Sequence, residues 1–169
     1  MSEKASKRGY AAVKPIINDN NNILASLDTI NYPKGVERIK TSKLHVTLMY
    51  DERDPKAEIE IPAVIYNASV VGAAILGKAV VLMLASDELS ERHRYLIKSG
   101  FKYSHDNYTP HLSIVYAETD EAKEQLPGIL AEVQRLLNEG KLPKTLYLTD
   151  EYWNTCLDDE NVIRAFYDK

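Results

Sequence analysis

The chain has 169 residues, 44% of them hydrophobic and 27% charged, which is the composition of an ordinary globular protein. Its net charge of −4 argues against a binder of long nucleic acid, because such proteins present a broad basic face, but it does not exclude a small nucleotide. The lone Cys156 cannot form an intrachain disulfide, and the apolar stretches are too short and interrupted to span a membrane. We therefore expect one cytosolic domain over residues 1–169.

The first half of the chain is predicted to contain two strands and a helix. Residues 9–17 are typical of a strand, and the turn-prone Asn and Asp residues that follow should end it. Apolar residues at helical spacing predict a helix over residues 20–31. We expect a polar connector over residues 32–43, and then a second strand over residues 44–50.

The second half carries more elements with clear boundaries. Gly77 and Lys78 should form the tight turn of a hairpin, Ser86 or Asp87 should cap a helix, and Pro127 suits the first turn of another. The pattern predicts strands over residues 63–76, 79–85, 111–117 and 145–154, one helix running to Ser99, and another ending at Gly140.

One four-residue pattern occurs in each half, as "HVTL" from residue 45 and "HLSI" from residue 111. Side chains of a strand alternate between its two faces, so His45 and Thr47 should share one face, as should His111 and Ser113. If the two strands are close in one sheet, two imidazoles and two hydroxyls converge on one cleft.

Two histidines and two hydroxyls suit the cleavage of a phosphodiester. One neutral histidine can accept a proton from the attacking oxygen, while the other, protonated, donates a proton to the leaving oxygen. The hydroxyls can donate hydrogen bonds to the phosphate oxygens, where charge develops in the transition state. A zinc site is a weaker alternative, because only His105 or Asp106 could supply a third ligand. His93 is expected on a solvated helix face.

The two motifs resemble those of the 2H phosphoesterase superfamily, as does the approach to the second motif, "YTPHLSI". This resemblance implies an α+β, bilobal fold, in which two antiparallel sheet lobes with flanking helices surround a central cleft. It also implies that no metal or other cofactor is needed. His45 and His111 would be the acid–base pair, and Thr47 and Ser113 would hold the phosphate.

Within the superfamily, "ASKRGYAAVK" and "LHVTLMYDERD" are similar to the phage anti-CBASS nucleases. Those nucleases cut the cyclic oligonucleotide messengers of a bacterial defence system. The resemblance implies a phosphodiesterase that cleaves 3′-5′ linkages of cyclic di- or trinucleotides in the cytoplasm of the infected cell. We expect a monomer that binds neither membrane nor long nucleic acid.

Three residues are candidates for binding the bases of such a substrate. Tyr10 begins the first strand and Trp153 ends the last one, and an aromatic ring at a cleft edge can stack on a base. Asn107 precedes the second motif, where its amide could read a base edge. Core packing is the alternative for each aromatic residue.

Two other functions are compatible with the motifs. A 2H enzyme of RNA metabolism would act on 2′-5′ linkages or 2′,3′-cyclic phosphate ends. A cyclic-nucleotide sponge would bind the messenger without cutting it, although binding alone does not need two titratable groups. Base preference, ring size, linkage type and the division of acid and base roles are left open.

Overall fold

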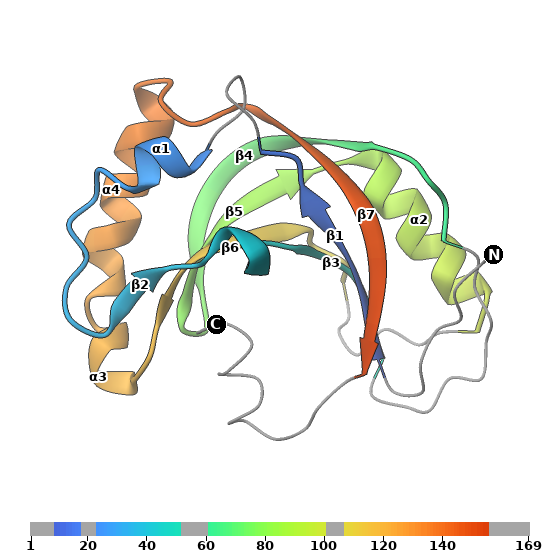
Figure 1. Cartoon of the computed structure of the whole chain (residues 1–169), viewed down its shortest axis with the longest axis horizontal. Helices are drawn as coiled ribbons and strands as arrows, with labels where there is room; N and C mark the ends of the chain where they lie inside the picture. Colours follow the sequence, from blue (N-terminus) through green and yellow to red (C-terminus); the bar gives the residue numbers. More distant parts are fainter. Residues whose placement is uncertain (1–8, 18–22, 52–60, 101–106, 156–169) are drawn as a thin grey trace.

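The computed structural model describes residues 9–17, 23–51, 61–100 and 107–155, and shows a mixed α+β fold with one large antiparallel sheet (Figure 1). The strands are β1 (Gly9–Pro15), β2 (Val36–Arg38), β3 (Val46–Asp51), β4 (Tyr66–Leu76), β5 (Ala79–Ala85), β6 (His111–Ala117) and β7 (Thr145–Thr155). The helices are α1 (Ile23–Leu27), α2 (Asp87–Lys98), α3 (Asp120–Lys123) and α4 (Leu126–Asn138), with a 3-10 turn at Thr41–Lys43.

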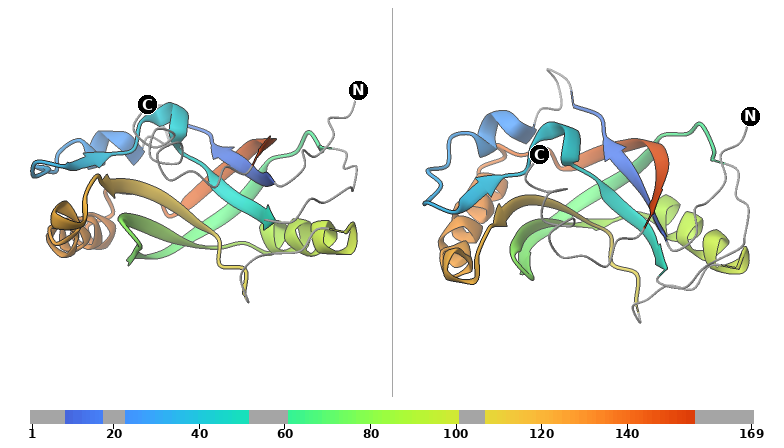
Figure 2. Two further views of the ribbon diagram at one scale, coloured as in Figure 1. Left: turned by 90° about the horizontal axis from the view of Figure 1, so that it is seen from below. Right: turned by 60° about the horizontal axis from the view of Figure 1, so that its bottom comes forward.

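The sheet has the order β2-β6-β3-β1-β7-β4-β5, and β5 pairs in addition with β6. The strands from β6 through β3, β1, β7, β4 and β5 therefore return to β6 and form a ring. Figures 1 and 2 show the resulting strong curvature, with α2 and α4 at opposite ends of the arch. This arrangement brings β3 and β6, from different halves of the chain, side by side. All described strands belong to one sheet, so a division into two lobes stays a prediction.

The main core occupies one face of this sheet. Val46 of β3, Leu112 of β6 and Leu82 of β5 are paired across three neighbouring strands, and all three are fully buried. The same core cluster contains residues of both longer helices, among them Leu96 of α2 and Val133 of α4. Because strand side chains alternate, the residues between these core positions face the opposite side.

The longer elements of the second half confirm the sequence predictions. The β4–β5 hairpin turns at Gly77, which has a φ of 57° that suits glycine. The Ser86 hydroxyl caps α2 by accepting a hydrogen bond of 3.2 Å from the amide of Leu89. Pro127 lies in the first turn of α4, where its missing N–H costs nothing.

The first half departs from the predictions at two places. The helix expected over residues 20–31 is described only as the short α1, and residues 18–22 lie outside the described part. The expected connector over residues 32–43 contains β2, whose Val36 pairs with Ala117 of β6. Only three residues pair there, too few for an alternation of polar and apolar residues to be recognised in the sequence.

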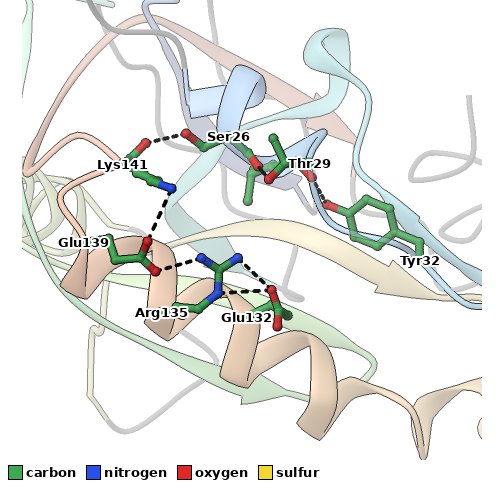
Figure 3. Close-up of polar contacts among 8 residues, drawn as sticks. Ser26, Thr29, Tyr32, Glu132, Arg135, Glu139 and Lys141 are labelled. Carbon is green, nitrogen blue, oxygen red and sulfur yellow. Dashed lines mark hydrogen bonds and ion pairs between the residues drawn. The ribbon is translucent and has the colours of Figure 1, made fainter.

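The short helix α1 is fixed to the end of α4 by a hydrogen bond that Figure 3 shows. The Ser26 hydroxyl donates a hydrogen bond of 2.5 Å to the carbonyl of Lys141, just past α4. On the exposed side of α4, Arg135 forms ion pairs with Glu132 at 2.9 Å and Glu139 at 2.7 Å. These exposed ion pairs join residues of α4 to one another and contribute little, whereas α1 is held by the Ser26 hydrogen bond and by the burial of Leu27.

No helix in the described ranges combines the length and the apolar character needed to cross a bilayer.

Candidate active site

The two sequence motifs lie side by side in the sheet. β3 and β6 run antiparallel and pair through Val46 and Leu112, so the condition under which the two motifs converge is met. Continuing this register by one residue each way sets the histidine of each motif opposite the hydroxyl of the other, with His45 opposite Ser113 and Thr47 opposite His111. All four are half-buried and alternate with core residues, so they share the face of the sheet opposite the main core.

Both histidine rings are held by the same kind of hydrogen bond. Nδ1 of His45 lies 2.8 Å from the carbonyl oxygen of Lys43, and Nδ1 of His111 lies 2.9 Å from that of Thr109. A carbonyl oxygen can only accept, so in each ring Nδ1 carries the proton and donates it. Nε2 is therefore the nitrogen left for a substrate. In both motifs the accepting carbonyl belongs to the residue two positions before the histidine.

The surroundings of His45 favour its neutral form. Burial lowers the pKa of His45, because an imidazolium loses hydration in the protein interior. The carbonyl of Lys43 opposes this effect by accepting the Nδ1 proton, whereas the positive charges of His111 and Lys14 lower the pKa further. The electrostatic effect of His111 on His45 agrees with the placement of the two rings on one face.

A lysine that the sequence analysis did not single out lies on the same face. Ala12 of β1 pairs with Thr47 on one side and with Tyr152 of β7 on the other. Lys14 is two residues further along β1, and continuing the register sets it opposite His45. Its Nζ lies 5.4 Å from the centre of the Tyr152 ring. A charged residue directly after the apolar run "YAAV" was the available signal.

Two aromatic side chains support β3 beside the site. The Tyr108 hydroxyl donates a hydrogen bond of 2.9 Å to the carbonyl of Thr47, and Nδ1 of His93 donates one of 2.6 Å to the carbonyl of Leu48. The two rings stack with their centres 4.2 Å apart. Leu48 is an extra residue in the β1–β3 register, where β3 departs from regular pairing. Tyr108 and His93 thus supply hydrogen bonds to the backbone at this irregular point.

The expectation that His93 is solvated is therefore wrong. His93 is 5% exposed and lies on the core face of α2 with Leu89 and Leu96. The spacing of four and three residues from these leucines is the helical core pattern, and it could have placed His93 correctly.

The structure describes the side chain of only one of the three predicted base-binding residues, so it does not show whether the three lie together. Tyr10 of β1 is opposite Asn154, and Trp153 of β7 is opposite Ala11, so their backbones lie on adjacent strands. Their side chains fall outside the described part, as do those of His105, Asp106 and Cys156. Asn107 is exposed in the bend before β6. Within the described part no cluster of three or more His, Cys, Asp or Glu residues could hold a metal.

A comparison with known proteins places this site in a family. The family model described as anti-CBASS protein Acb1 matches residues 8–139, which include both motifs. The chain belongs to the Acb1 family. The Acb1 match also includes β1 and α2, and it stops before β7, which carries Tyr152 and Trp153.

One relative supports this assignment. The anti-CBASS protein Acb1 of Escherichia phage RB16 is 31% identical over 122 residues, which cover 69% of this chain and 64% of the relative. The chain thus spans less than two thirds of the length of that Acb1 protein.

Proposed function

We propose that this Acb1-family protein is a 2H-type, metal-independent phosphodiesterase that cleaves 3′-5′ linkages of cyclic di- or trinucleotides. By destroying these messengers it would block CBASS signalling in an infected bacterium. The observation that carries the proposal is the duplicated histidine geometry, in which two rings with matched Nδ1 hydrogen bonds lie on adjacent strands beside the β3–β6 pairing. Membership of the Acb1 family supports the nature of the substrate.

The two histidines have different roles in this proposal. His45 is the base, since its lowered pKa leaves Nε2 unprotonated and able to accept a proton near neutral pH. His111 is the acid, and its Nε2 donates a proton to the leaving oxygen. Thr47 and Ser113 donate hydrogen bonds to the non-bridging phosphate oxygens.

The nucleophile in this mechanism comes from the substrate. His45 removes the proton of the ribose 2′-OH, whose oxygen forms a bond to the adjacent phosphorus while the bond to the 5′-oxygen breaks. His111 protonates that 5′-oxygen, and the product carries a 2′,3′-cyclic phosphate. Water then attacks the same phosphorus with the histidine roles reversed, giving a monophosphate end.

The experiment that tests the proposal follows the fate of cyclic nucleotides by chromatography. We expect linear products from cyclic di- or trinucleotides in the presence of excess chelator, and a loss of roughly 10²–10⁴-fold in turnover for His45→Ala and His111→Ala. Circular dichroism should show that both variants are folded. Folded variants with wild-type turnover would refute the acid–base assignment, and activity lost to chelation would favour metal chemistry.

The same substrates distinguish the other two functions. Cleavage restricted to linear 2′-5′ linkages or 2′,3′-cyclic phosphate ends would indicate an RNA-processing enzyme. Tight binding of an intact cyclic nucleotide, without any product, would indicate a sponge.

A deoxyribose analogue tests the source of the nucleophile. A cyclic dinucleotide made from 2′-deoxyribose keeps its bases and phosphates, so it should bind within a few-fold of the ribose form. It should not be cut, because the attacking hydroxyl is missing. Equal rates for the two substrates would show that a histidine activates water directly.

A further inference from the structure

Lys14 occupies an unusual place for a lysine, in the interior of the sheet and on the face that carries both motifs. It is half-buried in β1, which lies between β3 and β7, and it contributes to lowering the pKa of His45. In the described part of the chain Lys14 forms no ion pair, and its ammonium makes a cation–π contact with the ring of Tyr152. Half-burying an ammonium without a carboxylate partner is costly, so a negatively charged ligand would stabilise the site.

The contact with Tyr152 joins the lysine to the strand on the other side of β1 from the motifs. β7 is on the far side of β1 from β3, so the ammonium contacts a residue two strands from His45, while its charge still acts on that histidine. Neighbouring strands are about 4.8 Å apart, which sets the backbone of Lys14 about 10 Å from that of β6, two strands away. A charge at this distance is well placed for a second anionic group of a ligand whose first group lies between the two histidines.

We propose that Lys14, positioned by the ring of Tyr152, binds the phosphate of a cyclic dinucleotide that is not being cut. This inference rests on the proposed function for the identity of the ligand. A cyclic dinucleotide has two phosphates, and the two histidines and two hydroxyls of the motifs serve the one that reacts. The second phosphate needs a local cation, because the chain as a whole has a net charge of −4.

Equilibrium binding to the His111→Ala protein tests the proposal without turnover. The two probes are a cyclic dinucleotide, with two phosphates, and the linear dinucleoside monophosphate with the same bases, which has one. Adding Lys14→Met should weaken binding of the cyclic probe by roughly 10–100-fold, the usual worth of a charge-assisted hydrogen bond. Binding of the linear probe should change by less than about threefold.

Two further variants control for charge and for folding. Lys14→Arg keeps the positive charge and should recover most of the affinity for the cyclic probe. Lys98→Met removes the same charge from the exposed end of α2 and should leave both affinities unchanged. Matching thermal unfolding of Lys14→Met and Lys14→Arg would exclude a folding defect.

The outcomes separate this inference from the proposed function. Equal binding of the cyclic probe with and without Lys14 would overturn the inference, as would an equal loss for both probes. If the wild-type protein cuts no cyclic nucleotide while binding still depends on Lys14 and on the second phosphate, the cleavage proposal fails and the Lys14 site stands.

Discussion

The rings of His45 and His111 make matching hydrogen bonds but differ in their contact with water, since the bond of His45 is partly buried and that of His111 is exposed. The strand alternation in "HVTL" and "HLSI" was sufficient to predict that each histidine shares a face with a hydroxyl. It could not predict the carbonyls that fix the Nδ1 proton, because their positions depend on how the backbone turns before each strand. Lys14 was missed because its relation to His45 arises only from the β1–β3 register.

The pH profile tests the assignment of His45 as the base. The base must be neutral, so on the acid side kcat/KM should fall when the pH drops below the pKa of His45, which is lower than the ordinary value of about 6.5. Because His111 must be protonated to act as the acid, kcat/KM should also fall on the alkaline side and so pass through a maximum. We expect the acid limb of the profile below pH 6.5. Lys14→Met removes a positive charge that disfavours the imidazolium, so it should raise the pKa of His45 and move this limb to higher pH. An acid limb that stays in place in Lys14→Met would contradict the assignment.

At the scale of elements, the most predictable parts were those with local signals. Ser86 and Pro127 mark the beginnings of α2 and α4, and Gly77 marks the β4–β5 turn. The backbone supports of the site were not predictable, because Tyr108 and Thr47 come from segments far apart in the chain. A hydrogen bond between them depends on the tertiary fold alone.

Tyr108 links the loop before β6 to the carbonyl of Thr47, so its hydroxyl should help to align the two motifs. Tyr108→Phe keeps the ring that stacks on His93 and removes only this hydroxyl. We expect a loss of about 1–2 kcal/mol in the free energy of unfolding, measured with urea, because the carbonyl loses a hydrogen bond. The turnover number should fall more than the apparent affinity changes. Tyr147→Phe, on an exposed position of β7, is the control and should alter neither quantity.

Arg92 of α2 and Glu151 of β7 form an ion pair that fixes the helix to the sheet. The guanidinium of Arg92 donates two hydrogen bonds to the two carboxylate oxygens of Glu151, at 2.9 and 2.7 Å. The side chain of Arg92 is 11% exposed and that of Glu151 is 1% exposed. Removing one partner leaves the other charge buried without its counter-ion. Glu151→Gln should therefore lower the free energy of unfolding by about 3–5 kcal/mol. The double replacement Arg92→Met with Glu151→Leu should recover much of this loss.

The exposed ion pairs of α4 supply the matched control for this prediction. Arg135→Met removes two ion pairs of similar length, but its side chain is 46% exposed, so the loss should be within about 1 kcal/mol. Urea unfolding followed by circular dichroism measures the wild type and all three variants. If Glu151→Gln were no more destabilising than Arg135→Met, the Arg92–Glu151 pair would have no special structural role.

For the whole molecule, the repeated motif suggested what would follow if two distant strands met, but it did not indicate that the sheet forms a ring. The ring is closed by the pairing of β5 with β6, and β7 inserts between β1 and β4 from the end of the described chain. Such pairings join strands from all parts of the sequence, and a single sequence contains no local signal for them. The direct pairings of β1 with β3 and of β3 with β6 set Lys14, His45 and His111 along one face.

Acid stability is a property of the whole fold that follows from the buried His93 and the half-buried His45. Burial lowers the pKa of both His45 and His93, so the unfolded chain, with histidine pKa values near 6.5, binds protons more readily than the folded one. Above about pH 6.5 both states are neutral at these sites and stability is complete. As the pH falls below that value, the unfolded chain gains protons first and stability is lost. Each histidine contributes a slope of at most about 1.4 kcal/mol per pH unit.

Urea unfolding at several values between about pH 7 and pH 5, above the range in which most carboxylates titrate, measures this slope. His93→Gln can still donate a hydrogen bond to the carbonyl of Leu48 but cannot take up a proton. It should be less stable than the wild type at pH 7, because the ring stack with Tyr108 is lost, and its stability should fall less steeply toward pH 5. A wild-type stability that is constant over this range, or an unchanged slope in His93→Gln, would show that His93 is not held neutral by its burial.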